Sequence, residues 1–338
     1  MKTSTINRRW FRFGLITLAI ALSPTLASAE KSAAWKDLAT RSNAKGFNSS
    51  RLPVLVRKPG IGNDAMGQKV IDLLASKFGL GASDVQKAAE PKGLRIESPG
   101  WNVRVSDDGN TVRVRMGGDQ HVFVPAIGQA SYAQIESAAR KFIGNELVDF
   151  IKLAPNEALI PLGTRYVHSG GYDIHASTSE PVQTKQWSMA FGRTIDGEAV
   201  VGGGAIVAVI FRADNTVAGF DFDWPQYEKS AVQVDTMATA AIRARGRGLD
   251  KRGSQIQSRE MRFECGLFDP GGKSTRRRLE YIQPACFQTL VTSNAKSPGT
   301  EGGVAVAIPA AQTPMNDAKW SEAAALCSQP GQACRAIP

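Results

Sequence analysis

Apolar residues recur along this chain with two different periods, and each period predicts a different kind of element. Helical spacing appears in residues 64–78, and Gly79 follows where a C-cap belongs. A second helical pattern covers residues 131–150 and begins with a Ser-x-x-Gln capping box. A third runs from residue 235 to about residue 245. We therefore expect three helices, each separated from the next by a long non-helical stretch.

Alternating apolar and polar positions predict strands in those stretches. The segments are 94–97, 101–106, 111–116 and 121–124 after the first helix, 165–173, 185–194, 200–211 and 216–223 after the second, and 259–265 and 279–291 after the third. Asp196-Gly197 is a typical hairpin turn, because both residue types tolerate positive φ. Helix followed by antiparallel strands indicates an α+β fold in which each sheet is packed by a helix.

The same order of elements occurs three times and suggests repeated units. A short similarity between two segments supports this repetition. Val103-Arg104-Val105 precedes Asn110-Thr111-Val112, and Val207-Ala208-Val209 precedes Asn215-Thr216-Val217. The predicted parts are a signal peptide (1–29), an extended leader (30–62), an N-terminal α+β unit (63–128), a second α+β domain (129–230) and a C-terminal α+β unit (231–338). A hydrophobic content of 42% with 21% charged residues is ordinary for globular domains.

The first 29 residues have the composition of a signal peptide. Four basic residues precede the apolar run 13–22, and Ala27-Ser28-Ala29 is a small-residue cleavage site. A run of ten residues is too short to span a bilayer as a helix, and no later segment is long enough, so we expect no transmembrane segment in the mature chain. We expect an exported protein, periplasmic or extracellular. The general secretory route and the twin-arginine route, suggested by Arg8-Arg9, both remain open.

All four cysteines lie in the last quarter of the chain, which predicts two disulfides in an exported protein. They are Cys265, Cys286, Cys327 and Cys334. Four cysteines permit three pairings, and loop closure favours the nearest neighbours, Cys265 with Cys286 and Cys327 with Cys334. No Cys-x-x-Cys spacing or histidine pair accompanies them, so we expect neither a metal nor a cofactor at these positions.

Basic residues are concentrated towards the C-terminal third. The formal net charge of +10 falls to +6 when the four basic residues of the signal peptide are removed. The candidate polyanion-binding residues are Arg243, Arg245, Arg247, Arg276, Arg277 and Arg278. Export and the absence of interleaved aromatic residues argue against nucleic acid as a partner. Anionic envelope material, such as lipid head groups or acidic polysaccharide, is the alternative partner.

A resemblance to a known family comes from the segment Trp187-Ser-Met-Ala-Phe-Gly-Arg-Thr-Ile-Asp-Gly-Glu-Ala-Val-Val-Gly202. This aromatic-rich strand, Asp-Gly turn and Val-Val-Gly strand resemble PepSY and thermolysin-propeptide modules, over about residues 131–224. The resemblance implies a module that assists or inhibits a peptidase, or that binds a ligand at the envelope. No His-Glu-x-x-His motif is present, so it implies a stand-alone binding module and not a zymogen.

The residues that could form a polar site are few. Asp221, Asp223 and Trp224 form the best cluster, because alternation places both carboxylates on one face of a strand. The three histidines, His121, His168 and His175, have no metal-ligand spacing. We therefore expect an exported, non-enzymatic binding protein whose partner is a protein or an envelope component, such as a peptidase-inhibitor-like or assembly module. The alternatives are a secreted hydrolase that uses Asp221 and Asp223, and an envelope polyanion-binding protein.

Overall fold

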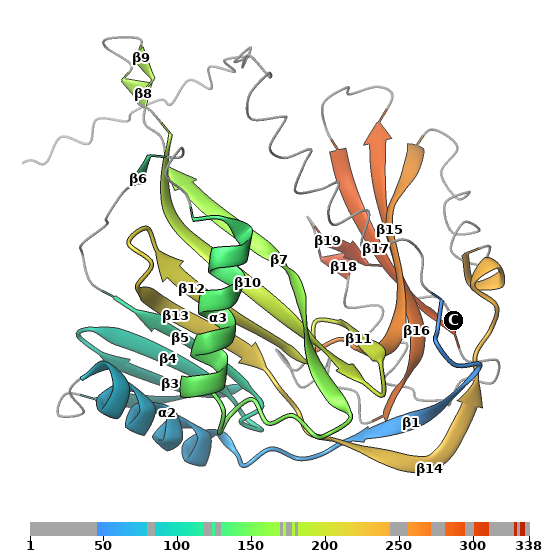
Figure 1. Ribbon diagram of the computed structural model, residues 1–338, viewed down its shortest axis with the longest axis horizontal. Coiled ribbons are helices and arrows are strands. Elements are labelled where there is room, and N and C mark those ends of the chain that lie inside the picture. Colours follow the sequence, from blue (N-terminus) through green and yellow to red (C-terminus); the bar gives the residue numbers. More distant parts are fainter. Residues whose placement is uncertain are drawn as a thin grey trace, which may run out of the picture. The chain divides into compact units, whose positions relative to one another are not determined.

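The computed structural model describes residues 46–79, 85–117, 124–125, 130–169, 172–173, 178–179, 182–243, 256–271, 281–294, 301–310, 328–329 and 332–334 (Figure 1). These residues all belong to one compact unit, Ser42–Pro338. Within them the structure has two longer helices and nineteen strands. The helices are α2 (Asn63–Phe78) and α3 (Tyr132–Glu146), and residues 239–243 form a short helical segment.

The strands are β1 (Arg51–Arg57), β2 (Gln86–Glu90), β3 (Gly93–Ser98), β4 (Trp101–Ser106), β5 (Thr111–Met116), β6 (Val124–Pro125), β7 (Glu157–Ser169), β8 (Tyr172–Asp173), β9 (Thr178–Ser179), β10 (Gln183–Ile195), β11 (Glu198–Gly202), β12 (Ile206–Arg212), β13 (Val217–Asp223), β14 (Tyr227–Asp235), β15 (Ile256–Asp269), β16 (Tyr281–Asn294), β17 (Glu301–Pro309), β18 (Ser328–Gln329) and β19 (Gln332–Cys334).

Eight of these strands form an antiparallel sheet, which we call the first sheet. Its order is β2-β3-β4-β5-β13-β12-β10-β7. The pairing of β5 with β13, in which Asp221 lies opposite Arg113, joins the strands that follow α2 to those that follow α3. Figure 1 shows these two sets of strands side by side behind the two helices.

A second, mixed sheet is connected to the first through the β10–β11 hairpin. Strand β11 runs parallel to β15. Strand β15 pairs antiparallel with β16, β16 pairs antiparallel with β17, and β19 runs parallel to β17. Strand β1 pairs with β14 along its length and with β16 at Leu55 and Val56. Through these pairings seventeen strands form one hydrogen-bonded network, while β8 and β9 form a separate pair.

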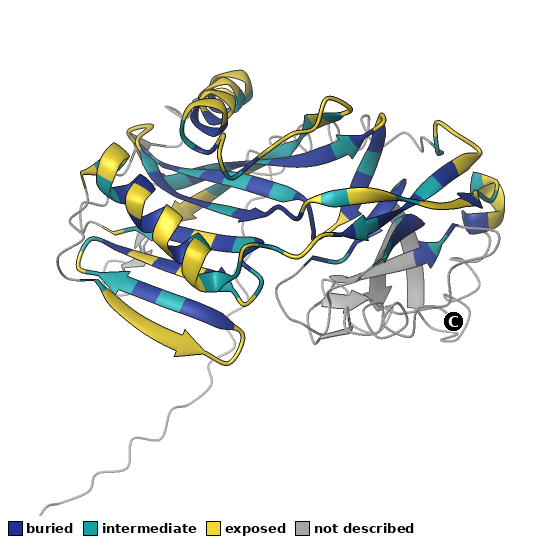
Figure 2. Cartoon of the chain, turned by 90° about the horizontal axis from the view of Figure 1, so that it is seen from below, coloured by how far each residue is buried: buried dark blue, intermediate teal, exposed yellow. Residues whose placement is uncertain are grey.

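Helices α2 and α3 pack on the same face of the first sheet, α2 on β3 and β4 and α3 on β7, β10 and β12. The ring of Phe142 on α3 lies between Phe78 of α2 and Phe220 of β13, with centroid distances of 6.2 and 5.9 Å. Figure 2 shows buried and exposed residues alternating along α2, as expected for an amphipathic helix. The predicted helix ends are confirmed at Gly79, which has φ 62°, and at the Ser131 capping box.

The predicted fold class, α+β with separate helix-packed sheets, is wrong. The described residues form a β-rich fold with a large mixed sheet and few helices. The two predicted units do not form separate sheets because of β5. If the first unit ended at this strand, the outer edge of β5 would expose unpaired N–H and C=O groups. Pairing with β13 satisfies these groups and fuses the units predicted at 63–128 and 129–230. Strand β1 lies in the predicted leader, and Asp235, predicted to begin a helix, ends β14.

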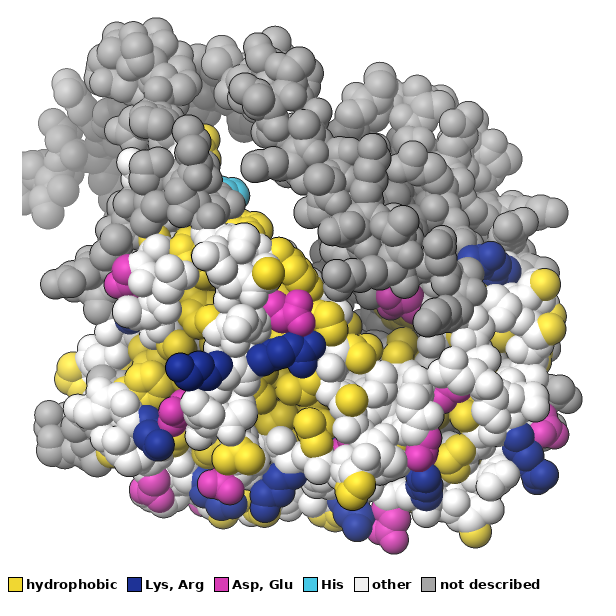
Figure 3. Space-filling view, viewed as in Figure 1, with side chains coloured by type: hydrophobic (Ala, Val, Ile, Leu, Met, Phe, Trp, Pro, Cys, Tyr) yellow, Lys and Arg dark blue, Asp and Glu magenta, His cyan; other side chains and the backbone are white. Residues whose placement is uncertain are grey.

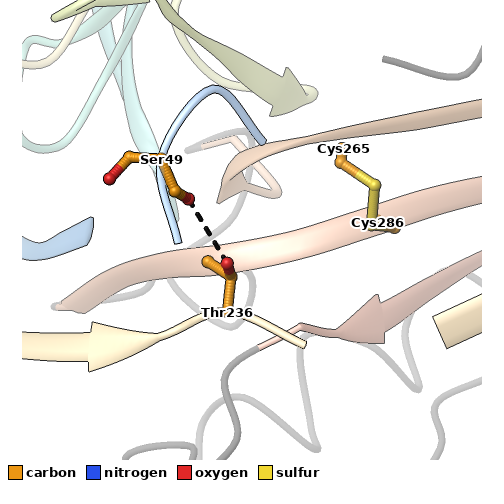
Figure 4. Close-up of a disulfide and its surroundings, with 4 residues drawn as sticks. All are labelled: Ser49, Thr236, Cys265 and Cys286. Atoms are coloured by element: carbon orange, nitrogen blue, oxygen red, sulfur yellow. Dashed lines mark hydrogen bonds between the residues drawn. A yellow bond between two sulfur atoms is a disulfide. The ribbon is translucent and has the colours of Figure 1, made fainter. Parts of the chain in front are cut away.

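The predicted disulfide between Cys265 and Cys286 is confirmed (Figure 4). The two residues lie directly opposite each other on β15 and β16. Nearby, the Thr236 hydroxyl donates to the Ser49 carbonyl oxygen at 3.3 Å. Cys327 lies outside the described residues, as does the side chain of Cys334, so the second pairing stays a prediction.

Candidate binding face

The predicted carboxylate Asp221 lies on the face of the first sheet that is turned away from the helices. Its neighbours on β13, Phe220 and Phe222, point to the opposite face and are buried in the core with α2 and α3. Both Asp221 oxygens accept hydrogen bonds from the Arg115 guanidinium, one of them at 2.7 Å. A second guanidinium, that of Arg113, lies 3.7 Å away. Asp221 therefore serves as the counter-ion of two arginines.

Asp223 has a different and buried environment. Its carboxylate lies 3.2 Å from the Arg57 guanidinium, which also pairs with Asp269 at 2.8 Å. The side chains of Arg57, Asp223 and Asp269 are 3%, 5% and 0% exposed. Asp221 and Asp223 thus have separate arginine partners, and the structure does not bring them together as a pair of catalytic acids.

Trp224 is buried as well. Its indole Nε1 donates to the Lys152 carbonyl oxygen at 3.2 Å, and the Arg193 guanidinium lies 5.0 Å from its ring centroid. Arg193 is fully buried, pairs with Glu157 and donates to the Pro225 carbonyl oxygen at 2.7 Å. Trp224 therefore packs inside the protein and offers no surface for a ligand.

Asp269 is the centre of a buried ion network with Arg57, Asp223 and Tyr227. The Tyr227 hydroxyl and the Gly271 N–H both donate to it. Burial, and then the charge of Asp269, raise the pKa of Tyr227 well above its ordinary value. Burial by itself lowers the pKa of Arg57, but the Asp269 and Asp223 charges outweigh it and raise that pKa. The network therefore keeps Arg57 charged and Tyr227 neutral.

The triple glycine 202–204 makes room for this network. A Cβ atom added to Gly204 would lie 2.2 Å from the Asp269 Cγ, and one added to Gly202 would lie 2.2 Å from the Asp269 carbonyl oxygen. The Gly204 N–H donates to that carbonyl oxygen at 2.9 Å. The glycines thus allow close backbone packing against a buried carboxylate.

Four arginines gather on the helix-free face of the first sheet, around Asp221. Alternation places them there, because their neighbours on β3, β4 and β5 are buried on the helix side. Arg104 lies directly opposite Arg95 on one side and opposite Arg113 on the other. We call the set formed by Arg95, Arg104, Arg113 and Arg115 with the carboxylates of Glu97 and Asp221 the arginine face.

The arginine face has an excess of positive charge. Arg95 pairs with Glu97, and Arg113 and Arg115 share Asp221, so four arginines meet two carboxylates. Arg104 is exposed and forms no ion pair with any described residue. Adjacent strands are about 4.8 Å apart, and like charges directly opposite destabilise a sheet. On the face that carries the helices, acidic and basic side chains are interspersed among hydrophobic ones (Figure 3).

A polar hollow of about 430 Å³ adjoins the arginine face at the β3–β4 turn. Its lining residues are Gln86, Glu97, Ser98, Pro99, Trp101, Asn102 and Gly117. Gln86, Glu97 and Asn102 lie side by side on β2, β3 and β4, and Asn102 is directly opposite Arg115. Side chains of the hollow and the arginines are therefore neighbours in the same sheet register.

The predicted C-terminal basic residues are only partly described. The Arg243 guanidinium lies 4.5 Å from the Phe263 ring centroid, in contact with the core of the second sheet. Arg245, Arg247, Arg276, Arg277 and Arg278 lie outside the described residues. Their proposed role in binding polyanions stays a prediction.

Of the three histidines in the sequence, only His168 has a side chain that the structure describes. Its ring stacks on Tyr166 with centroids 6.1 Å apart, and its Nδ1 lies 3.2 Å from the Thr184 hydroxyl. His121 and His175 lie outside the described residues. Within the described residues, no three His, Cys, Asp or Glu side chains gather where they could hold a metal ion. No helix in the described ranges is both long and apolar enough to cross a membrane.

The sequence prediction missed the arginine face, although a signal for it was present. Arginine alternates with valine in Val103-Arg104-Val105 and in residues 112–115, which indicates strands with one apolar and one cationic face. What the pattern does not contain is the cross-strand register that places Arg104 between Arg95 and Arg113.

Comparison with known proteins identifies no family for this chain. Neither a family model nor a curated protein sequence matches this chain. Among solved structures, an uncharacterized protein from Eubacterium rectale is similar with a TM-score of 0.47 and 10% sequence identity, and the match covers 78% of this chain and 85% of that chain.

Proposed function

We propose that this chain is an exported binding protein that holds an anionic partner of the cell envelope or the medium on its arginine face. The single observation that carries the proposal is the row Arg95, Arg104 and Arg113, directly opposite one another on adjacent strands. In the unbound protein this arrangement is unfavourable, because like charges repel across the sheet. An anionic ligand would reverse the sign of that interaction and gain charge-assisted hydrogen bonds.

The proposed location rests on the signal-peptide pattern of residues 1–29, and the disulfide on β15 and β16 is compatible with it. A direct test is the intact mass of the protein recovered from the periplasm or the medium. We expect a chain that begins at Glu30, and an uncleaved chain retained in the cytoplasm would contradict export.

Binding is tested with the oxidised chain from residue 30 to residue 338 on immobilised polygalacturonate and polyglutamate. We expect retention on at least one polymer at low ionic strength and release at about 1 M salt, where the Debye length is about 3 Å. Arg104→Glu should weaken binding about tenfold or more, since it places a repelling charge at the centre of the row.

Arg51→Glu is the matched control, because Arg51 is an exposed arginine of β1, outside the first sheet. We expect this variant to bind like the wild type. Equal losses in both variants, or no retention on either polymer, would refute the proposed function. The alternative of a hydrolase at Asp221 and Asp223 has no observation in its favour, since each carboxylate pairs with its own arginine.

A further inference from the structure

We infer that the arginine face and the adjoining polar hollow bind one acidic oligosaccharide, with sugar hydroxyls in the hollow and carboxylates on the arginines. This inference rests on the proposed function and names the ligand class for the same site.

The hollow has the composition of a site for hydroxyl groups. Gln86 and Asn102 each offer an amide donor and an amide acceptor, and Ser98 offers a hydroxyl. Glu97 is an acceptor only, and among the described residues its one hydrogen bond is from Arg95 to Oε1. The Glu97 side chain is 47% exposed and meets water there, and a ligand O–H or N–H group can replace that water. Its volume of about 430 Å³ lies within the usual range for small-ligand sites.

The strand register places the hydroxyl-binding and carboxylate-binding groups next to each other. Asn102 lies two residues before Arg104 on the same face of β4, and it lies directly opposite Arg115 of β5. In the same way, Glu97 lies two residues after Arg95 on β3. A ligand that fills the hollow can therefore reach Arg104 with a carboxylate without crossing another strand.

These groups favour a saccharide over an acidic peptide. An acidic peptide offers the hollow one backbone N–H and one C=O per residue, whereas each sugar ring offers several hydroxyls that both donate and accept, as the amides of Gln86 and Asn102 require.

The test compares three probes of equal length: hexagalacturonate, with carboxylates and hydroxyls; maltohexaose, with hydroxyls and no carboxylates; and hexaglutamate, with carboxylates and backbone amides but no hydroxyls. Binding to the oxidised chain 30–338 is measured by calorimetry at low ionic strength. We expect hexagalacturonate to bind at least tenfold more tightly than either other probe. Asn102→Ala and Arg104→Ala should each weaken its binding about tenfold.

Two variants serve as controls. Gln226→Ala removes an exposed amide, and Arg51→Ala an exposed guanidinium, both outside the first sheet, and we expect neither to change the affinity for hexagalacturonate. All four variants replace exposed side chains, and an unchanged thermal unfolding temperature verifies that each folds.

The outcomes separate the two proposals. Equal binding of hexaglutamate and hexagalacturonate, with Asn102→Ala neutral, overturns the saccharide inference and leaves the proposed function in place. Equal binding of maltohexaose and hexagalacturonate, with Arg104→Ala neutral, overturns both. If no probe binds, the saccharide inference is overturned, and the polymer-retention experiment decides the proposed function separately.

Discussion

Replacing Arg57 by Met should strongly destabilise the protein. Arg57 supplies the cation for two buried carboxylates, with its Nη1 2.8 Å from an Asp269 oxygen and its Nη2 3.2 Å from an Asp223 oxygen. Methionine fills much of the same volume with an unbranched apolar chain, so the main change is the loss of charge and hydrogen bonds. Asp223 and Asp269 are then left close together without their counter-ion.

The size of the effect follows from burial. The side chains of Asp223 and Asp269 are 5% and 0% exposed, so water cannot replace the guanidinium. Removing one partner of a buried ion pair lowers the free energy of unfolding by about 3–5 kcal/mol. At about 2–4 °C per kcal/mol, the unfolding temperature should fall on the order of 10 °C.

Urea unfolding followed by tryptophan fluorescence measures this loss. Arg51→Met is the matched control on the same strand, because the Arg51–Asp235 pair has a separation of 3.9 Å and side chains that are 65% and 64% exposed. We expect the control to stay within about 0.5 kcal/mol of the wild type. Adding Asp223→Asn to Arg57→Met should restore part of the loss, because it removes an uncompensated charge. A loss below about 1 kcal/mol, or one equal to that of the control, would refute the reasoning.

Three further predictions concern the same framework. Replacing Cys265 and Cys286 together by Ala should lower the free energy of unfolding by about 3 kcal/mol in the chain-entropy model, and a reducing agent should lower the stability of the wild type but not of the double variant. Because the pKa of Tyr227 is raised in the folded state, its neutral form contributes stability that is fully present below pH 10 and is lost as the pH rises through the folded-state pKa. Above pH 10 the unfolding temperature of the wild type should therefore fall more steeply with pH than that of Tyr227→Phe. Parallel declines in thermal melts of the two proteins would contradict this. Gly204→Ala places a Cβ atom 2.2 Å from the Asp269 Cγ and should lower the free energy of unfolding by about 1–3 kcal/mol. An unchanged urea midpoint would contradict this prediction and show that the site can relax.

Local features of the sequence predicted local structure well. Helical spacing and Gly79 located α2, the Ser131 capping box located the start of α3, and Asp196-Gly197 located the β10–β11 turn. The short loop between Cys265 and Cys286 favours their pairing, and the structure confirms this disulfide. Each of these features depends on residues close together in the chain, where side-chain chemistry and backbone preference act directly.

The pairing of distant strands was decided only by the tertiary structure. Alternation indicates which residues share a face of a strand, but it does not say which strand lies beside it. For that reason the sequence did not show that β5 pairs with β13, 106 residues apart at Arg115 and Asp221, and the predicted separate sheets were wrong.

Tertiary structure also decided what each charged residue does. Asp221 and Asp223 have the same side chain two positions apart, yet one lies on the arginine face and the other is buried with Arg57, 166 residues away. Sequence alone determined that this strand carries carboxylates on one face. Whether a carboxylate meets water, a ligand or a buried guanidinium depends on long-range packing, because burial and neighbouring charge come from residues that are brought together only by the fold.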